Sequence, residues 1–279
     1  MIEQVKNKVE NGIRSMPSLS PAVTQIIDLA NDINATPRDL TEIIKTDPAL
    51  TTKILNLVNS SYFSMPNKVA SVTRAIVLLG FNTIKNIALS AEFVKLKDSN
   101  PRNKKFNYTE LWKHMLSVGV VAKSIARETG QPRENIEEYF ITGLIHDLGH
   151  FMLMHHATNE FYKIIQYANS KALSVEKCTR EVFGFSGQDL TVKILNHWKL
   201  QEQLCDAISD TKGEQSHLGK VLSISDKFCR ANEYGYVINQ NQTEISENEY
   251  ASVDLEQSFL ENNKSDLEDK IHQAQIFIS

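Results

Sequence analysis

The sequence has few cysteines and no long apolar run. Its 279 residues include three widely spaced cysteines, at 178, 205 and 229. This odd number excludes a closed disulfide framework and a paired zinc signature, and it indicates a reducing cytoplasm. The longest apolar stretches, such as residues 75–80, are far shorter than the roughly 20 residues that span a bilayer. Residues 1–6 lack the apolar core of a signal peptide. We therefore expect a soluble, cytoplasmic protein with no membrane partner.

An excess of positive charge is also missing. Lys and Arg number 30 against 34 Asp and Glu, so the net charge is −4. Nucleic acid is bound through a concentrated basic surface, so we expect no nucleic acid partner. With 41% hydrophobic and 23% charged residues, the composition is that of a globular protein and not of a disordered or fibrous one.

No alternation of apolar and polar residues lasts long enough to predict a sheet, whereas helix signals are frequent. A capping residue precedes a proline at 20–21, 36–37 and 47–48, the order that begins a helix. Apolar residues recur three and four positions apart within residues 22–30 and again within 111–125. The sequence therefore predicts an all-α fold built from many helices.

Composition divides the chain into segments. Residues 97–107 are rich in turn formers and charge and have no apolar period, which predicts a linker. This linker separates an N-terminal helical half at 11–96 from a second helical half at 108–236. The remaining residues, 237–279, form an acidic C-terminal extension whose spaced apolar residues predict amphipathic helices. We expect the extension to pack on the body or on another copy of the chain, which leaves a homodimer open.

Two segments resemble a known family. Residues 46–64 read TDPALTTKILNLVNSSYFS, and residues 72–86 read VTRAIVLLGFNTIKN. Together with Trp112, His114 and the His-Asp-Leu-Gly of residues 146–149, they resemble the HDOD family. This family, the HD-related output domains of bacterial signal-transduction proteins, is related to the HD and HD-GYP superfamily. The resemblance covers about residues 11 to 235. It implies an all-α fold in which an N-terminal helical subdomain packs on an HD-like helical bundle.

The resemblance also implies a metal site. HD proteins hold their metal with a histidine, a His-Asp pair and a later aspartate, which correspond here to His114, His146, Asp147 and Asp226. Independently of the resemblance, Asp147 falls within the apolar stripe of its predicted helix, and a buried carboxylate needs a partner. That partner is either a metal with imidazole ligands, or an Arg, a Lys or a helix N-terminus. Imidazole and carboxylate suit first-row metals, so the expected cofactor is one divalent ion of iron, manganese, nickel or zinc.

Three further residues are candidates for contacting a ligand or supporting the metal ligands. His150 follows His146 by four residues and would share its face on a continuous helix, but Gly149 predicts that the helix ends there. Asn59 and Ser60 lie close to an apolar face. Polar side chains in such a place either contact a ligand or satisfy backbone groups, and both interpretations stay open.

The sequence also departs from catalytic relatives. HD-GYP enzymes carry a lysine where His150 stands, Gly187 replaces a histidine, and residues 209–210 replace a His-His pair. A second metal would therefore lack ligands, which disfavours two-metal hydrolysis. We expect a non-catalytic regulatory module that binds a signalling protein or a small regulator and retains one metal. Whether the chain is an enzyme stays open. The alternative is a metal-dependent HD-type phosphohydrolase acting on nucleotides or cyclic dinucleotides.

Overall fold

The computed structural model describes most of the chain, and its regular elements are helices. The described residues are 2–15, 18–30, 32, 34–95, 105–133, 135–200, 202–209, 216–238, 241 and 243–278. No strand occurs within these ranges, so the predicted all-α fold is confirmed. Of the predicted linker, residues 97–104 lie outside the described residues.

The helices of the N-terminal half begin at capping residues followed by proline. Thr36 and Asp39 form a capping box at the start of α3, and Asp47 accepts a hydrogen bond of 2.9 Å from the Leu50 N–H at the start of α4. A proline takes the first helical position in each, where its missing N–H costs nothing. The helices are α1 (Ile2–Arg14), α2 (Pro21–Ala30), α3 (Pro37–Lys45), α4 (Pro48–Val58), α5 (Val72–Leu79) and α6 (Phe81–Lys95).

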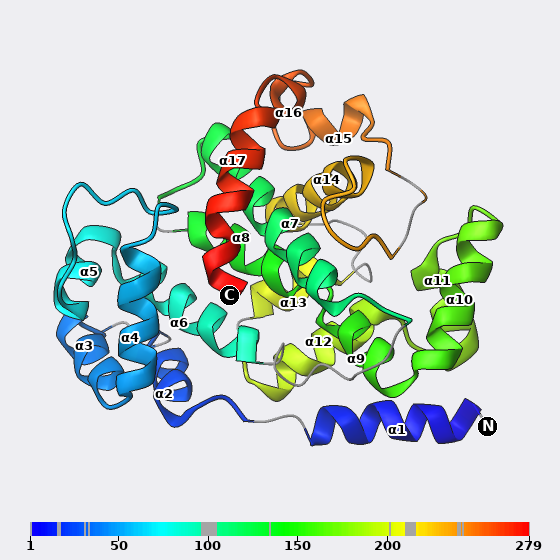
Figure 1. Cartoon of the computed structure of the whole chain (residues 1–279), viewed down its shortest axis with the longest axis horizontal. Coiled ribbons are helices and arrows are strands. Elements are labelled where there is room, and N and C mark those ends of the chain that lie inside the picture. Colours follow the sequence, from blue (N-terminus) through cyan, green and yellow to red (C-terminus); the bar gives the residue numbers. More distant parts are fainter. Residues whose placement is uncertain are drawn as a thin grey trace.

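The second half is built around one long helix. The helices here are α7 (Tyr108–Glu128), α8 (Ile136–Ile145), α9 (Leu148–His156), α10 (Thr158–Ser170), α11 (Val175–Phe183), α12 (Gly187–His197), α13 (Glu202–Ile208) and α14 (His217–Ala231). Most of α7 is buried, and it packs against both α8 and α14. Figure 1 shows α1 apart from α2–α5, because this first helix packs against α9 and α11 of the second half.

Two glycines let α7 and α8 approach each other closely. A Cβ on Gly143 would lie 2.4 Å from the Gly119 backbone nitrogen, and one on Gly119 would lie 2.6 Å from the Phe140 carbonyl oxygen. A side chain at either position would force the helices apart. This contact sets the separation of His114 on α7 from His146 directly after α8, whose ring centroids lie 5.5 Å apart.

We expect Gly143→Ala to destabilise the protein by about 1–3 kcal/mol, because the added methyl group has only backbone to displace. Thermal unfolding followed by circular dichroism measures this loss. Gly219→Ala on α14 is a milder control, since its Cβ would meet its nearest neighbour, the Ala207 carbonyl oxygen, at 3.1 Å. A Gly143→Ala protein as stable as the control would show that α7 and α8 can separate freely.

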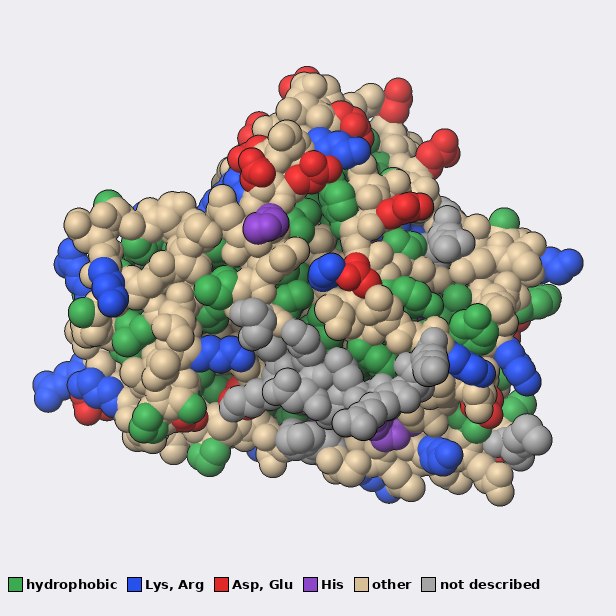
Figure 2. All heavy atoms as spheres, in the orientation of Figure 1, with side chains coloured by type: hydrophobic (Ala, Val, Ile, Leu, Met, Phe, Trp, Pro, Cys, Tyr) green, Lys and Arg blue, Asp and Glu red, His purple; other side chains and the backbone are tan. Residues whose placement is uncertain are grey.

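The described part of the C-terminal extension is helical and contacts both halves. It comprises α15 (Glu247–Ala251), α16 (Phe259–Asn262), α17 (Lys264–Ala274) and the 3-10 turn η2 (Gln275–Ile278). The buried ring of Phe277 lies 4.9 Å from that of Phe140 on α8 and 5.2 Å from that of Tyr62, which follows α4. In Figure 2 acidic side chains gather on the outer surface of this region, which is the top of the molecule in that view.

None of the described helices is, alone, both long and apolar enough to cross a bilayer. The sharply bent pair α5 and α6 matches by length and composition only.

Candidate metal centre

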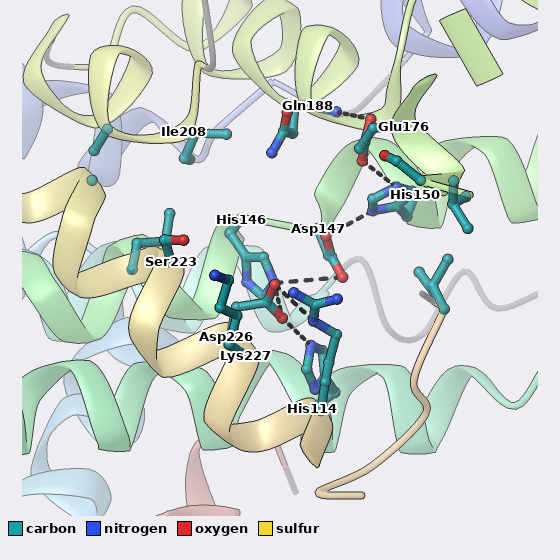
Figure 3. Close-up of a pocket in the computed structure, with 17 residues that line it drawn as sticks. His114, His146, Asp147, His150, Glu176, Gln188, Ile208, Ser223, Asp226 and Lys227 are labelled. Carbon is teal, nitrogen blue, oxygen red and sulfur yellow. Dashed lines mark hydrogen bonds and ion pairs between the residues drawn. The ribbon is translucent and has the colours of Figure 1, made fainter. Parts of the chain in front are cut away.

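Three side chains from two segments meet at the base of a cleft. His114 lies on α7, and His146 and Asp147 form the turn between α8 and α9. One ligand atom of each lies within 4.8 Å of the other two. Asp226 of α14 faces them, with its Oδ1 3.2 Å from His114 Nε2 and 3.9 Å from His146 Nε2 (Figure 3). The structure thus brings together the four residues that were predicted as metal ligands from the resemblance to HD proteins.

Backbone carbonyls fix the tautomers of both imidazoles. His114 Nδ1 lies 3.1 Å from the Tyr234 carbonyl oxygen, and His146 Nδ1 lies 2.7 Å from that of Gly143. A carbonyl oxygen only accepts hydrogen bonds, so each Nδ1 carries the hydrogen and donates it. The Nε2 atoms therefore face the two carboxylates. Metal-binding histidines commonly have this arrangement, in which the outer nitrogen donates to a carbonyl.

The Nε2 atom of His146 is buried and has no hydrogen-bond partner within the described ranges of the chain. The carboxylate oxygens facing it are Asp147 Oδ2 at 3.5 Å and Asp226 Oδ1 at 3.9 Å. A nitrogen lone pair and a carboxylate repel each other unless a proton or a cation lies between them. Two imidazole nitrogens and two carboxylates are a donor set that first-row divalent metals accept. The residues present therefore fit such an ion.

The charges around the cluster keep Asp147 ionised. Burial raises the pKa of Asp147, but the neighbouring His146 and His150, the latter also through a hydrogen bond, outweigh it and bring that pKa below its usual range. For His114, burial lowers the pKa, whereas the hydrogen bond and charge of Asp226 raise it above its ordinary value. A carboxylate that stays ionised near neutral pH is in the form that binds a cation.

His150 occupies the other side of Asp147. Its Nδ1 lies 2.7 Å from Asp147 Oδ1, and its Nε2 lies 2.6 Å from Oε1 of Glu176 on α11. Burial lowers the pKa of His150, but these two carboxylates raise it well above its ordinary value. Both ring nitrogens then carry hydrogen: Nδ1 donates to Asp147, and Nε2 is ion-paired with Glu176. One of the two oxygens of Asp147 is therefore already bound to a cation supplied by the protein.

The prediction that Gly149 ends a helix is wrong. Helix α8 ends at Ile145, before His146, and α9 contains both Gly149 and His150. Close packing explains the glycine, because a Cβ at this position would lie 1.9 Å from the Gly187 carbonyl oxygen of α12. His146 and His150 consequently do not share the face of one continuous helix.

A buried threonine on α12 supports this turn. Thr191 Oγ1 accepts a hydrogen bond of 2.9 Å from the Gly149 N–H. The same hydroxyl lies 2.9 Å from the His146 carbonyl oxygen and donates to it. Thr191 is fully buried, so water cannot replace either bond. It links α12 to His146, one of the candidate metal ligands.

We expect Thr191→Val to lower the free energy of unfolding by about 1–3 kcal/mol, because it leaves the Gly149 N–H buried without an acceptor. The turn would also hold His146 less firmly, and metal affinity should fall by about tenfold. Urea unfolding and metal titration measure the two effects. Thr179→Val is the matched control, since the buried Thr179 hydroxyl bonds, among the described residues, only a carbonyl of its own helix. Equal losses in both variants would contradict a specific role for Thr191.

Two further residues of this cluster were not predicted from the sequence. Arg230 stands one helical turn after Asp226 on α14, and its Nε lies 3.0 Å from Asp226 Oδ2. That spacing of four residues is a signal that the sequence does contain. Glu176 reaches His150 from α11, and nothing in the sequence pattern pairs these two residues.

The structure places Asn59 and Ser60 away from the candidate metal ligands. The Asn59 amide donates to the Val69 carbonyl at 2.9 Å and accepts from the Val69 N–H at 2.7 Å. The Ser60 hydroxyl donates to the Leu57 carbonyl at 2.6 Å. Both side chains hold the connection after α4, and neither lines the cleft.

The cleft over the cluster has a volume of about 220 Å³. Its wall includes Gln188 of α12 and two residues of α14, Ser223 and Lys227 (Figure 3). Lys227 Nζ lies 2.6 Å from Oε1 of Glu249, so α15 of the extension contributes an ion pair at the cleft wall.

Comparison with protein families agrees with this geometry. The model of the HDOD domain matches residues 16–213, most of the chain. The chain belongs to the HDOD domain family. The match takes in His114, His146 and Asp147 and ends before Asp226.

Solved structures share the whole HDOD fold. An HDOD domain protein of unknown function from Geobacter sulfurreducens matches with a TM-score of 0.78 and 18% identity over 99% of each chain. A protein provisionally named a phosphohydrolase, from Shewanella amazonensis SB2B, matches with a TM-score of 0.71 and 17% identity over 98% of each chain. At such identities the likeness shows the fold alone.

A curated relative is much longer than this chain. An uncharacterized protein of Treponema pallidum (strain Nichols) is 21% identical over 200 residues, which is 72% of this chain but 38% of that protein. The shared region is therefore one part of a larger protein in that organism.

Proposed function

We propose that this HDOD chain is a regulatory module that binds one divalent metal ion and does not hydrolyse phosphodiesters by a two-metal mechanism. His114, His146, Asp147 and Asp226 would hold the ion, which would supply a positive charge that pulls α7, the α8–α9 turn and α14 together. The observation that carries the proposal is the position of His150, whose ring contacts one oxygen of Asp147 and a carboxylate oxygen of Glu176.

In two-metal sites the ions lie about 3.5–4 Å apart and share ligands. A second ion that shared Asp147 would need the carboxylate oxygen that the His150 ring already contacts. The same ring also contacts Glu176. That ring is also stacked on Phe161, with centroids 5.7 Å apart. Gly187, which stands where relatives have a histidine, offers no ligand, and a Cβ there would lie 2.4 Å from His150 Nε2. These contacts support a single-metal site.

A regulatory role would work through the arrangement of the helical halves. A signalling protein or small regulator that binds one arrangement better than another shifts the population toward it. The C-terminal extension contacts both halves through Phe277, so it would respond to such a shift.

A second candidate function is a single-metal phosphohydrolase. Lys227 and Arg230 line the cleft that contains the metal ligands, where cations could bind a phosphate group. Both are paired within the protein, however, Arg230 with Asp226 and Lys227 with Glu249. A phosphate would have to compete with these carboxylates, which favours the regulatory role.

Elemental analysis of protein purified without chelators tests the proposal, together with a turnover screen. The screen adds manganese, iron, nickel or zinc and offers phosphomonoesters and cyclic dinucleotides. We expect one metal ion per chain and no turnover above the metal-only control. Turnover that disappears in Asp147→Asn would establish the phosphohydrolase instead. Protein without metal, even after reconstitution, would disprove the metal site.

A further inference from the structure

We infer that a second pocket, separate from the metal cleft, binds a nucleotide. This inference names the small regulator and so rests on the regulatory function proposed above. The pocket lies between four parts of the chain: the connection that follows α4, the C-terminal end of α7, the N-terminal end of α8, and α17. Its volume is about 580 Å³, which lies within the range of pockets that enclose small molecules. None of the residues lining it lines the metal cleft.

The charge of this pocket is opposite to that of the chain. Four cationic side chains and one carboxylate line it, a net charge of +3, whereas the chain as a whole carries −4. The carboxylate, Glu137, is already paired with the buried Lys123 at 2.5 Å. The other cations are Arg127, Arg133 and Lys270. Such a concentration of positive charge selects an anionic ligand.

Two of these cations are available to a ligand. Arg127 and Arg133 are exposed, and neither forms an ion pair with a carboxylate in the part of the chain that the structure describes. Lys270, in contrast, is 2.6 Å from Asp266 on the same helix. Guanidinium groups bind phosphate oxygens through pairs of parallel hydrogen bonds, so the two arginines suit a phosphate group.

Aromatic rings form the wall beside these cations. Tyr62 and Phe63 are half-buried lining residues whose rings meet edge to face with centroids 5.2 Å apart. The Tyr62 hydroxyl is buried, and among the described residues it has no hydrogen-bond partner. A ring on the ligand can stack on the exposed part of this wall. An aromatic base joined to phosphate has both a ring and a phosphate group. Inorganic phosphate lacks the ring, and a nucleoside lacks the phosphate.

Binding would connect three parts of the molecule. Phe63 belongs to the N-terminal half, Arg127 to the second half, and Lys270 to the extension. A nucleotide that contacts all three stabilises the arrangement in which they meet, which is the differential binding that a regulator requires. Helix α7 links this pocket to the metal centre, because it carries both Arg127 and His114.

Isothermal titration calorimetry of the 279-residue chain tests the inference. The probes are the 5′-monophosphates and 5′-diphosphates of adenosine, guanosine, cytidine and uridine, with inorganic phosphate and adenosine as the separate halves. We expect at least one nucleotide to bind with a micromolar Kd and both halves to bind much more weakly. Arg127→Gln and Phe63→Ala should each weaken binding by about tenfold or more. The exposed Arg74 on α5 provides the matched control, Arg74→Gln, which should leave the Kd unchanged.

The outcomes separate this inference from the proposed function. Binding that survives in Asp147→Asn and in chelated protein is assigned to the new pocket, whereas binding lost in both belongs to the metal cleft and overturns the inference. The inference also fails if every nucleotide binds more weakly than about 1 mM, the edge of specific affinity, or if Arg127→Gln and Phe63→Ala bind as well as the native chain. In these cases a protein that still carries one metal and shows no turnover leaves the regulatory proposal standing. Hydrolysis of the nucleotide at the metal cleft would overturn the proposed function instead.

Discussion

Asp147→Asn is expected to abolish metal binding. The amide keeps the shape of the side chain but removes the negative charge that faces His146 and His150. Losing an outer hydrogen-bond partner of a metal ligand already lowers affinity by about 10–100-fold, so losing a charged ligand should cost at least on the order of 100-fold. Elemental analysis should find metal in the native chain and almost none in the variant.

The control for this prediction is Asp28→Asn, which neutralises an exposed carboxylate on α2. It should retain full metal content. Because Asp147→Asn also weakens a buried contact with His150, a second variant tests the site without disturbing that contact. His146→Gln removes the unpartnered imidazole nitrogen and should lose the metal while its circular dichroism spectrum stays native. Full metal content in both variants would place the ion elsewhere in the protein.

Lys123→Met is expected to destabilise the protein by about 3–5 kcal/mol, the cost of leaving a buried carboxylate without its cation. Lys123 Nζ lies 2.5 Å from Glu137 Oε1, and the two side chains are only 6% and 9% exposed. The same ammonium group lies 4.6 Å from the centre of the Tyr62 ring and 5.8 Å from that of Phe140. Methionine has the length of the lysine stem, so packing changes little and the loss reports the charge.

A double variant separates the ion pair from its packing. Lys123→Met combined with Glu137→Leu removes both charges, and it should recover most of the lost stability, since apolar replacements of a buried pair are often neutral. Urea unfolding of the native chain, both single variants and the double variant gives the coupling energy. If the double variant is as unstable as Lys123→Met, the stem packing and not the charge is responsible.

The extent to which the site could be predicted differs from residue to residue. The burial of Asp147 was predictable because the apolar stripe of its predicted helix includes it; the residue is buried, although it lies in the turn between α8 and α9. The proximity of His114 to His146 was predictable from the resemblance to HD proteins, and their ring centroids lie 5.5 Å apart. Glu176 could not be found, because its contact with His150 depends on where α11 lies after packing on α10 and α1, and it leaves no trace in either segment.

Gly149 shows why local signals failed. Glycine is a common residue at a helix end, and the sequence contains no sign that another helix passes at this point. In the structure the nearest atom to its missing side chain belongs to Gly187, far along the chain. Tertiary packing, and not backbone conformation, selected the residue.

The turn between α8 and α9 has a mechanical consequence. His146 and Asp147 are the two residues that separate these helices, and both face the ion that we propose. An ion coordinated at a break between helices restrains the angle between their axes, because both helix ends are tied to one point. Its departure would free that angle at a joint that Thr191 braces from α12. Occupancy of a single ion would thereby set the stiffness of the whole second half.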